Sequence, residues 1–456
     1  MTAATTRAAL PIPPRVSAGE NAPTARVSWT RERVKRWGTR SMLSLADQGL
    51  TSIAGFGLNV FLARWLAAEA YGAFAVAFAG FLLVAGFHNV LLLEPLTVMG
   101  PAQHTERLAT YFRKQLIIHV LLVGSLSAVV LPAGLLIWNA QPRGSLGGAI
   151  VGSAMALPFL LLLWVVRRMC YVLQRPSIAV LGSSFYACYV FAGLFLLYVA
   201  NAVSPMSAFG VMGTGSLLAA WLLWHRLRVA DLPRAIEVEP LSVRVVWREN
   251  WIYGRWLVAS TALSSAANQT QMFLVAGVLG LGAAGILRAM QVPALVIMQI
   301  LAATGLVILP AFSYDFGSGA LERMRQKAKF VSLTLAALTV LVAGGLMPLA
   351  GKLERVFYGG KYADYAWLMP LLALVPAAIG ASLGHSMALR ASQKPRFDLV
   401  ANAIAAPVGV ISAFLFTREW GLAGAAGSMA LSYAAYSVVT CWMFSAQAVL
   451  SRNRGA

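Results

Sequence analysis

The stretch FLARWLAAEAYGAFAVAFAGF occupies residues 61–81 and consists of two apolar tracts separated by a short break. Arg64 lies near the end of the first tract, and Glu69 and Gly72 lie in the break. Two apolar tracts joined so closely predict a pair of antiparallel helices, and Gly72 permits the turn to close tightly. Arg64 and Glu69 are within reach of each other across this turn, so we expect them to form an ion pair.

The composition of the whole chain extends this pattern. Its 456 residues are 59% hydrophobic and 11% charged, with a mean hydropathy of +0.72, whereas soluble domains carry roughly 25% charged residues. The deficit predicts a polytopic membrane protein. Residues 1–40 differ, because they are rich in Pro, Ala, Thr and Ser and lack the apolar core of a signal peptide. We expect a disordered, basic arm there.

Hydrophobic stretches long enough to cross roughly 30 Å of hydrocarbon recur along the chain. Six lie within residues 41–226 and six within 254–446, with a polar linker at 227–253 and a tail at 447–456. They are 42–66, 73–98, 114–138, 147–173, 178–200, 206–226, 254–279, 285–312, 328–350, 364–388, 398–416 and 421–446. Six spans per half start both halves on the same side, as in a parallel repeat. The sequence therefore predicts an all-α protein with twelve transmembrane helices in two six-helix bundles around a central cavity.

Weak similarity between the halves supports this repeat. Aligning Phe61 with Phe273 superimposes polar residues of the first and seventh spans, and one inserted residue then places Gly72 on Gly285. Two equivalent bundles that face each other predict alternating access to the cavity between them.

The placement of lysine and arginine predicts the orientation in the membrane. Basic residues gather in the segments on the side of the N-terminus, whereas the opposite loops hold only Arg143, Lys352, Arg355, Lys361 and Arg418. We therefore expect both termini in the cytoplasm. The formal net charge of +20 is then a signal of topology, and no nucleic-acid partner is expected.

Polar side chains gather on one face of the first and seventh spans. Such a face is costly against lipid, so it is expected either to line the cavity or to bond neighbouring helices. The candidates for cavity lining are Gln48, Ser52, Asn59, Ser264, Asn268 and Gln271.

Arg288 begins the eighth span, with Gln291 and Gln299 on roughly the same face. A guanidinium binds phosphate through two parallel hydrogen bonds, so Arg288 and Gln291 are candidates for binding a phosphate-bearing substrate. The alternative is an arginine that extends to the membrane interface. Arg64 is a second cationic candidate, although it faces away from the polar stripe of its own helix.

Two acidic residues, Asp47 and Glu94, lie near the inner ends of the first two spans. Carboxylates there are candidates for binding a proton or a sodium ion that drives transport. Alternatively, they pair with nearby basic residues such as Arg107 or Arg168. Isolated histidines are expected to be packing residues, namely His88, His119 and His385.

Signs of chemistry are missing from the sequence. The run GGLMPLAGKLE at 344–354 has the wrong spacing for a phosphate-binding loop, and the three cysteines lie far apart. Because no nucleophile, metal set or long outer loop is present, we expect no enzyme activity, no metal and no cofactor.

Three stretches resemble polysaccharide transporters of the Wzx type, a branch of the multidrug, oligosaccharidyl-lipid and polysaccharide flippase superfamily. They are LNVFLARWLAAEAYGAFAVAFA at 58–79, YGGKYADYAWLMPLLAL at 358–374 and WGLAGAAGSMALSYAAYSVV at 420–439, with a basic loop between the last two. The matching positions are Leu62, Ala63, Arg64, Leu66, Tyr71, Gly72, Phe74, Tyr358, Gly359, Tyr362, Lys394, Gly421, Gly424, Ala425 and Ala426.

The resemblance implies a flippase in the bacterial inner membrane. Its substrate would be an undecaprenyl-pyrophosphate-linked oligosaccharide for an exopolysaccharide, capsule or O-antigen. Its partners would be membrane lipids and other polysaccharide-assembly proteins. The positive character that the family implies for the cavity would fall on Arg288 and Arg64. The alternatives are a cation-coupled multidrug exporter of the same superfamily and a membrane glycosyltransferase or polymerase.

Overall fold

The computed structural model describes residues 31–142, 144–228, 241–392 and 396–452, and the regular structure of these residues is helical throughout. The first half contains α1 (Arg31–Trp65), α2 (Ala68–His88), α3 (Glu94–Gln103), α4 (Leu108–Ala140), α5 (Ser145–Val172), α6 (Pro176–Val199) and α7 (Pro205–Leu227). A π-helical turn, η1 (Asn89–Leu93), joins α2 to α3, and a 3-10 turn, η2 (Thr105–Arg107), precedes α4. The expected arm falls mostly on residues 1–30, outside the described residues.

The second half contains α8 (Val243–Leu279), α9 (Leu281–Gly317), α10 (Leu321–Tyr358), α11 (Leu368–Leu372), α12 (Leu374–Ala391) and α13 (Arg396–Arg452), with a 3-10 turn η4 (Ala363–Tyr365) before α11. Two helices merge in α13 and meet at Gly421, whose φ of 56° and ψ of −133° interrupt the helical backbone. Each of the twelve expected spans therefore has a helical counterpart. The first helix of this half begins at Val243, inside the segment expected as a polar linker.

Within the described residues, nine segments are long and apolar enough to cross a membrane. They are Ala68–Gln103, Thr105–Ala140, Ser145–Val172, Pro176–Val199, Pro205–Leu227, Leu281–Gly317, Leu321–Tyr358, Leu368–Ala391 and Leu399–Ala446, the last of which holds both helices of α13. The chain is thus an integral membrane protein. The two helices that fall short are α1 and α8, which carry the predicted polar stripes.

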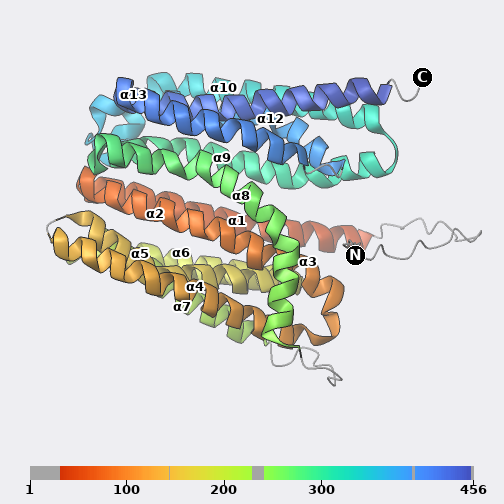
Figure 1. The fold of residues 1–456 in the computed structure, drawn as a ribbon, viewed down its shortest axis with the longest axis horizontal. Coiled ribbons are helices and arrows are strands. Elements are labelled where there is room, and N and C mark those ends of the chain that lie inside the picture. Colours follow the sequence, from red (N-terminus) through yellow and green to blue (C-terminus); the bar gives the residue numbers. More distant parts are fainter. Residues whose placement is uncertain (1–30, 143, 229–240, 393–395, 453–456) are drawn as a thin grey trace, which may run out of the picture.

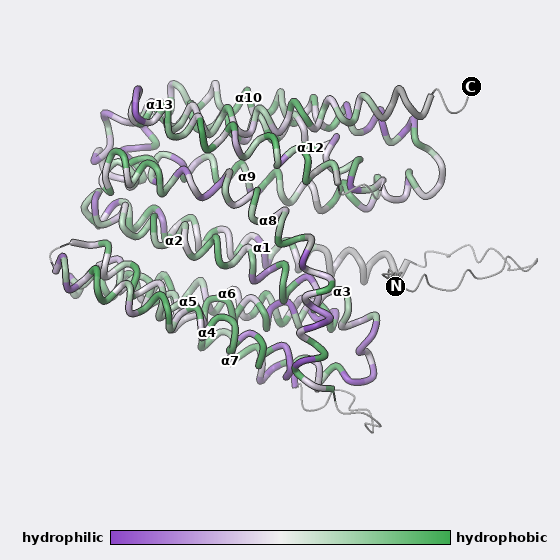
Figure 2. The backbone as a smooth tube through the Cα atoms, in the orientation of Figure 1, coloured by the Kyte–Doolittle hydropathy of each residue, from purple (hydrophilic) through white to green (hydrophobic). Residues whose placement is uncertain are grey.

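The helices form two lobes that lie side by side, α1–α7 in one and α9–α13 in the other, and α8 crosses from the first lobe to the second (Figure 1). We call the end of the protein where α1 meets α2 the turn face, and the end where α7 leads to α8 the linker face. Hydrophilic stretches gather mostly at these two ends, with hydrophobic stretches between them (Figure 2). This banding is expected of helices that cross a bilayer.

The apolar core is shared between the lobes at the turn face and divided at the linker face. Near the turn face, one cluster joins residues of both lobes, including Phe74 and Phe209 with Leu287 and Tyr358. Toward the linker face, the described residues form two separate clusters, one around Tyr111 and Met169 in the first lobe and one around Phe312 and Met387 in the second. The buried apolar core is therefore continuous between the lobes at one end only.

Two glycines allow the closest approach between the lobes. A Cβ atom on Gly72 would lie 1.7 Å from the carbonyl oxygen of Leu281, and one on Gly285 would lie 2.2 Å from that of Ala68. The backbones of α2 and α9 therefore touch where they cross. The sequence aligned Gly72 with Gly285 as equivalent residues, and the structure places them against each other at the seam between the lobes.

Candidate functional site

A polar cluster lies at this seam, toward the turn face. Arg288 of α9 is half-buried and donates from Nε to Oδ1 of Asn59 on α1, at 3.3 Å. The hydroxyl of Tyr71 on α2 donates to the same oxygen at 3.0 Å, and the guanidinium lies 5.7 Å from the ring centre of Phe78. The amide of Asn59, the phenol of Tyr71 and the ring of Phe78 orient the guanidinium, and none of these three groups carries a negative charge. It can therefore accept an anionic ligand.

The carbonyl end of α1 is held by the second lobe at the turn face. Helix C-termini leave carbonyl groups unsatisfied and carry a partial negative charge. The ammonium of Lys361 donates to the carbonyl oxygens of Ala63, at 2.9 Å, and Leu66, while Tyr362 donates its hydroxyl to Ala63 at 3.1 Å. Partial burial lowers the pKa of Lys361 below its ordinary value. We call Ala63, Leu66, Lys361 and Tyr362 the turn-face latch.

Replacing Lys361 by Met should weaken this closure. The change removes two hydrogen bonds from a charged donor, each contributing about 1.5–3 kcal/mol, so the population with the turn face open should rise at least about tenfold. With spin labels at positions 67 and 418, one on each lobe, double electron–electron resonance would show this as a new, longer distance between the labels. Arg355→Met is the matched control, and an equal change in both variants would contradict the role of Lys361.

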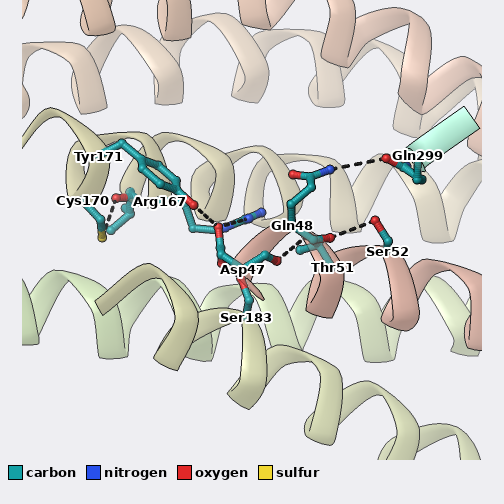
Figure 3. Close-up of polar contacts among 10 residues, drawn as sticks. Asp47, Gln48, Thr51, Ser52, Arg167, Cys170, Tyr171, Ser183 and Gln299 are labelled. Atoms are coloured by element: carbon teal, nitrogen blue, oxygen red, sulfur yellow. Dashed lines mark hydrogen bonds and ion pairs between the residues drawn. The ribbon is translucent and has the colours of Figure 1, made fainter. Parts of the chain in front are cut away.

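Asp47 is buried within the first lobe and fully engaged there. Arg167 of α5 donates to its Oδ2 at 2.5 Å, and the hydroxyls of Tyr171 and Ser183 also donate to the carboxylate. Figure 3 shows these three side chains directed at Asp47, with the neighbouring Gln48 pointing the other way. This arrangement ties α1 to α5 and α6.

Glu94 is the more accessible of the two acidic candidates. It is half-buried, follows the π-helical turn η1, and accepts a hydrogen bond from Asn89 at 3.2 Å. Arg168 of the same lobe donates to the side-chain oxygen of Asn89 at 3.5 Å, so Asn89 lies between the arginine and the carboxyl group.

The remaining candidates are spread along the seam and within the second lobe. Gln48 donates to Gln299 across the lobes at 3.5 Å (Figure 3), and Asn268 accepts from the hydroxyl of Tyr433 at 2.6 Å. Ser52 and Ser264 bond within their own helices, to the carbonyl oxygens of Gln48 and Thr261. Gln291 of α9 donates to the sulfur of Met429 on α13, and the buried Nε2 of Gln271 has no partner among the described residues.

One predicted pairing is wrong. Arg64 donates to the carbonyl oxygen of Val356 at 3.2 Å, and no ion pair in the described parts of the chain joins it to Glu69. The second lobe packs against the end of α1 and supplies this acceptor. Asp47 does pair with a basic residue, as the alternative to ion coupling expected, but its partner is Arg167 and neither of the two arginines given as examples.

Sequence reasoning also missed three residues of the site, Tyr71, Lys361 and Tyr362. All three lie within stretches quoted for the family resemblance, Tyr71 in 58–79 and the other two in 358–374. Their contacts run between segments that are far apart in sequence, so no local pattern signals them. The structure also brings two expected packing residues together, because Nε2 of His88 bonds Nδ1 of His119 at 3.0 Å. The part of the chain that the structure describes holds no group of acidic, histidine and cysteine residues arranged for a metal ion.

No family model and no curated protein sequence matches the chain. Solved structures do. An inward-facing multidrug resistance MATE family transporter of the MOP superfamily gives a TM-score of 0.75 at 12% identity, covering 91% of this chain and 100% of that one. The lipid II flippase MurJ in an inward closed conformation gives 0.68 at 15%, covering 88% and 87%. An outward-facing MATE transporter gives 0.65 at 12%, covering 90% and 96%.

These structures share one fold, and the chain has it. The predicted fold class, all-α with two six-helix bundles, is thereby confirmed. The similar structures are transporters and flippases, not enzymes.

Proposed function

We propose that the chain is a flippase that moves an undecaprenyl-pyrophosphate-linked oligosaccharide from the inner to the outer leaflet of the bacterial inner membrane. In this proposal the linker face and both termini are cytoplasmic, and the described conformation is inward-facing. The lobes would rock about the crossing of α2 and α9, opening the turn face as the linker face closes. The product would serve an exopolysaccharide, capsule or O-antigen.

The observation that carries the proposal is the sign of the charge at the seam. Arg288 meets the opposite lobe with Asn59 and Tyr71, neutral groups, around it. Asp47, by contrast, is bound inside its own lobe by an arginine and two hydroxyls. The charged side chains whose described contacts join the lobes toward the turn face, Arg288, Lys361 and Arg64, are all cations. Such a seam favours an anionic head, such as a diphosphate, over a cationic drug. The similarity to a lipid II flippase supports a lipid-linked substrate.

Arg288→Ala should block transport and leave the protein in the membrane. Losing the charge-assisted hydrogen bonds to phosphate should cost about 1.5–3 kcal/mol of binding free energy, so export should fall roughly tenfold to a hundredfold. Lipid-linked sugar should accumulate in the inner leaflet while the surface glycan decreases, at normal protein level. Arg418→Ala, at an exposed position on the turn face, is the control. Unchanged surface glycan in Arg288→Ala would remove Arg288 from the site.

A cation-coupled multidrug exporter is the second candidate, favoured by the similarity to a MATE transporter. In either case Glu94 is the better candidate for coupling to a proton or sodium ion, because Asp47 already accepts from three donors. Uptake of a fluorescent cation into inverted vesicles, driven by a proton gradient, would identify an exporter. Flipping of a lipid-linked sugar in proteoliposomes, without such uptake, would identify a flippase.

A further inference from the structure

A basic cavity of about 900 Å³ lies at the linker face between α6 and α7, away from the seam. Three arginines and a histidine line it, namely Arg175, Arg226, Arg228 and His225. No carboxylate is among the described residues of its lining. Like charges gathered around one hollow repel each other unless an anion joins them.

The backbone around the cavity also suits an anion. Helix α6 begins at Pro176, beside the cavity, and the structure gives its first turn no side-chain cap. Pro176 has no amide hydrogen and the amide of Ile178 donates to the carbonyl oxygen of Arg175 at 3.2 Å, which leaves the amide of Ser177, a residue of the cavity lining, to face an anion. At the other side, Arg228 ends α7 with a φ of 47° and a ψ of 51°. A left-handed conformation here is usually taken by glycine, and a side chain at this position is strained.

An apolar surface continues from the cavity along the same two helices. Ile178 and Leu181 line the cavity on α6, and Phe185 lies one turn further along with its side chain exposed. On α7 the ring of Trp221 stacks on His225 with centroids 6.0 Å apart, and Trp221 is 65% exposed. Tryptophan favours the membrane–water interface. The cavity therefore lies at headgroup depth, with a surface for acyl chains directly beside it.

We propose that this cavity is a binding site for an anionic phospholipid, whose phosphate the arginines hold while its acyl chains lie along Ile178, Leu181 and Trp221. The site is separate from the seam, so it does not depend on the identity of the transported substrate. Basic pockets between transmembrane helices on the cytoplasmic side bind anionic headgroups in this way.

The test uses the full-length protein in phosphatidylcholine-containing micelles, titrated with phosphatidylglycerol while bound lipid is counted by native mass spectrometry. The variant is Arg226→Gln with Arg228→Gly, because glycine suits the left-handed position and the fold should be kept. Each arginine near an anionic headgroup contributes about 1 kcal/mol, so the affinity of one lipid site should fall about thirtyfold. The melting temperature without phosphatidylglycerol should be unchanged or higher.

Arg323→Gln with Lys329→Gln is the matched control, since it removes the same charge from an exposed part of the linker face. Normal lipid binding in this control, with loss in the test variant, supports the site. Equal losses in both would overturn it, because they would reflect general surface charge. Equal stabilisation of the wild type by inorganic phosphate alone would also overturn it, since the ligand would then not be a lipid.

Discussion

Gly72→Ala should abolish transport and destabilise the turn-face-closed conformation. The added Cβ would lie 1.7 Å from the carbonyl oxygen of Leu281, and backbone surrounds it on both sides of the crossing. The helices α2 and α9 must separate until this contact reaches about 3.5 Å. Overpacking of this kind costs about 3 kcal/mol or more, so the closed conformation should lose roughly a hundredfold in population. Spin-label distances across the turn face would measure this, and under the proposed function the surface glycan would decrease as well.

Gly80→Ala is the control for this experiment, because Gly80 lies on the same helix and a Cβ there would meet nothing within 4 Å. Alanine also favours the helix over glycine, so this variant should be as stable as the wild type or more so. If Gly72→Ala transported like the wild type, closure of the lobes would not depend on the close contact between α2 and α9.

Asp47→Ala should have the largest effect on stability. It leaves the guanidinium of Arg167 and two hydroxyls without their common acceptor inside the first lobe. Breaking a buried ion pair in this way costs about 3–5 kcal/mol. The loss of stability should appear as a lower melting temperature of the purified protein, measured in the absence of substrate.

Asp364→Ala, an exposed aspartate on the turn face, serves as the comparison and should melt like the wild type. Asp47→Asn separates structure from ion coupling, because it keeps the shape and some acceptor capacity. If this variant melts nearly normally yet no longer responds to an ion gradient, Asp47 is the coupling residue after all, and our preference for Glu94 is wrong.

The number and order of the helices were predictable because each membrane helix must satisfy its backbone internally and carry an apolar surface. The expected span 206–226 corresponds closely to Pro205–Leu227, for example. The start of α8 was not predictable in the same way. Glu249 and Asn250 look like linker residues, yet they bond His104 and Gln115 of the first lobe, at 2.9 and 3.1 Å.

The candidate site was predictable only up to the face of each helix. Helical spacing placed Asn59 on a polar stripe and singled out Arg288, but nothing in either helix states that the two meet. Their contact depends on how the lobes dock. The error over Arg64 has the same origin, because its acceptor, Val356, belongs to a segment nearly three hundred residues away. Sequence-local partners are visible in a pattern, whereas partners set by docking are not.

The position of α8 makes it a lever. Its first turns are anchored to the first lobe through Glu249 and Asn250, and Gly254 packs against the carbonyl of Val90. Its far part is fastened to the second lobe through Asn268 and Tyr433. A rotation of one lobe relative to the other must therefore bend α8 between Gly254 and Asn268. A chain break within residues 229–240 would keep α8 whole, together with its contacts to both lobes. We therefore expect the two halves, when co-expressed, to assemble and function together.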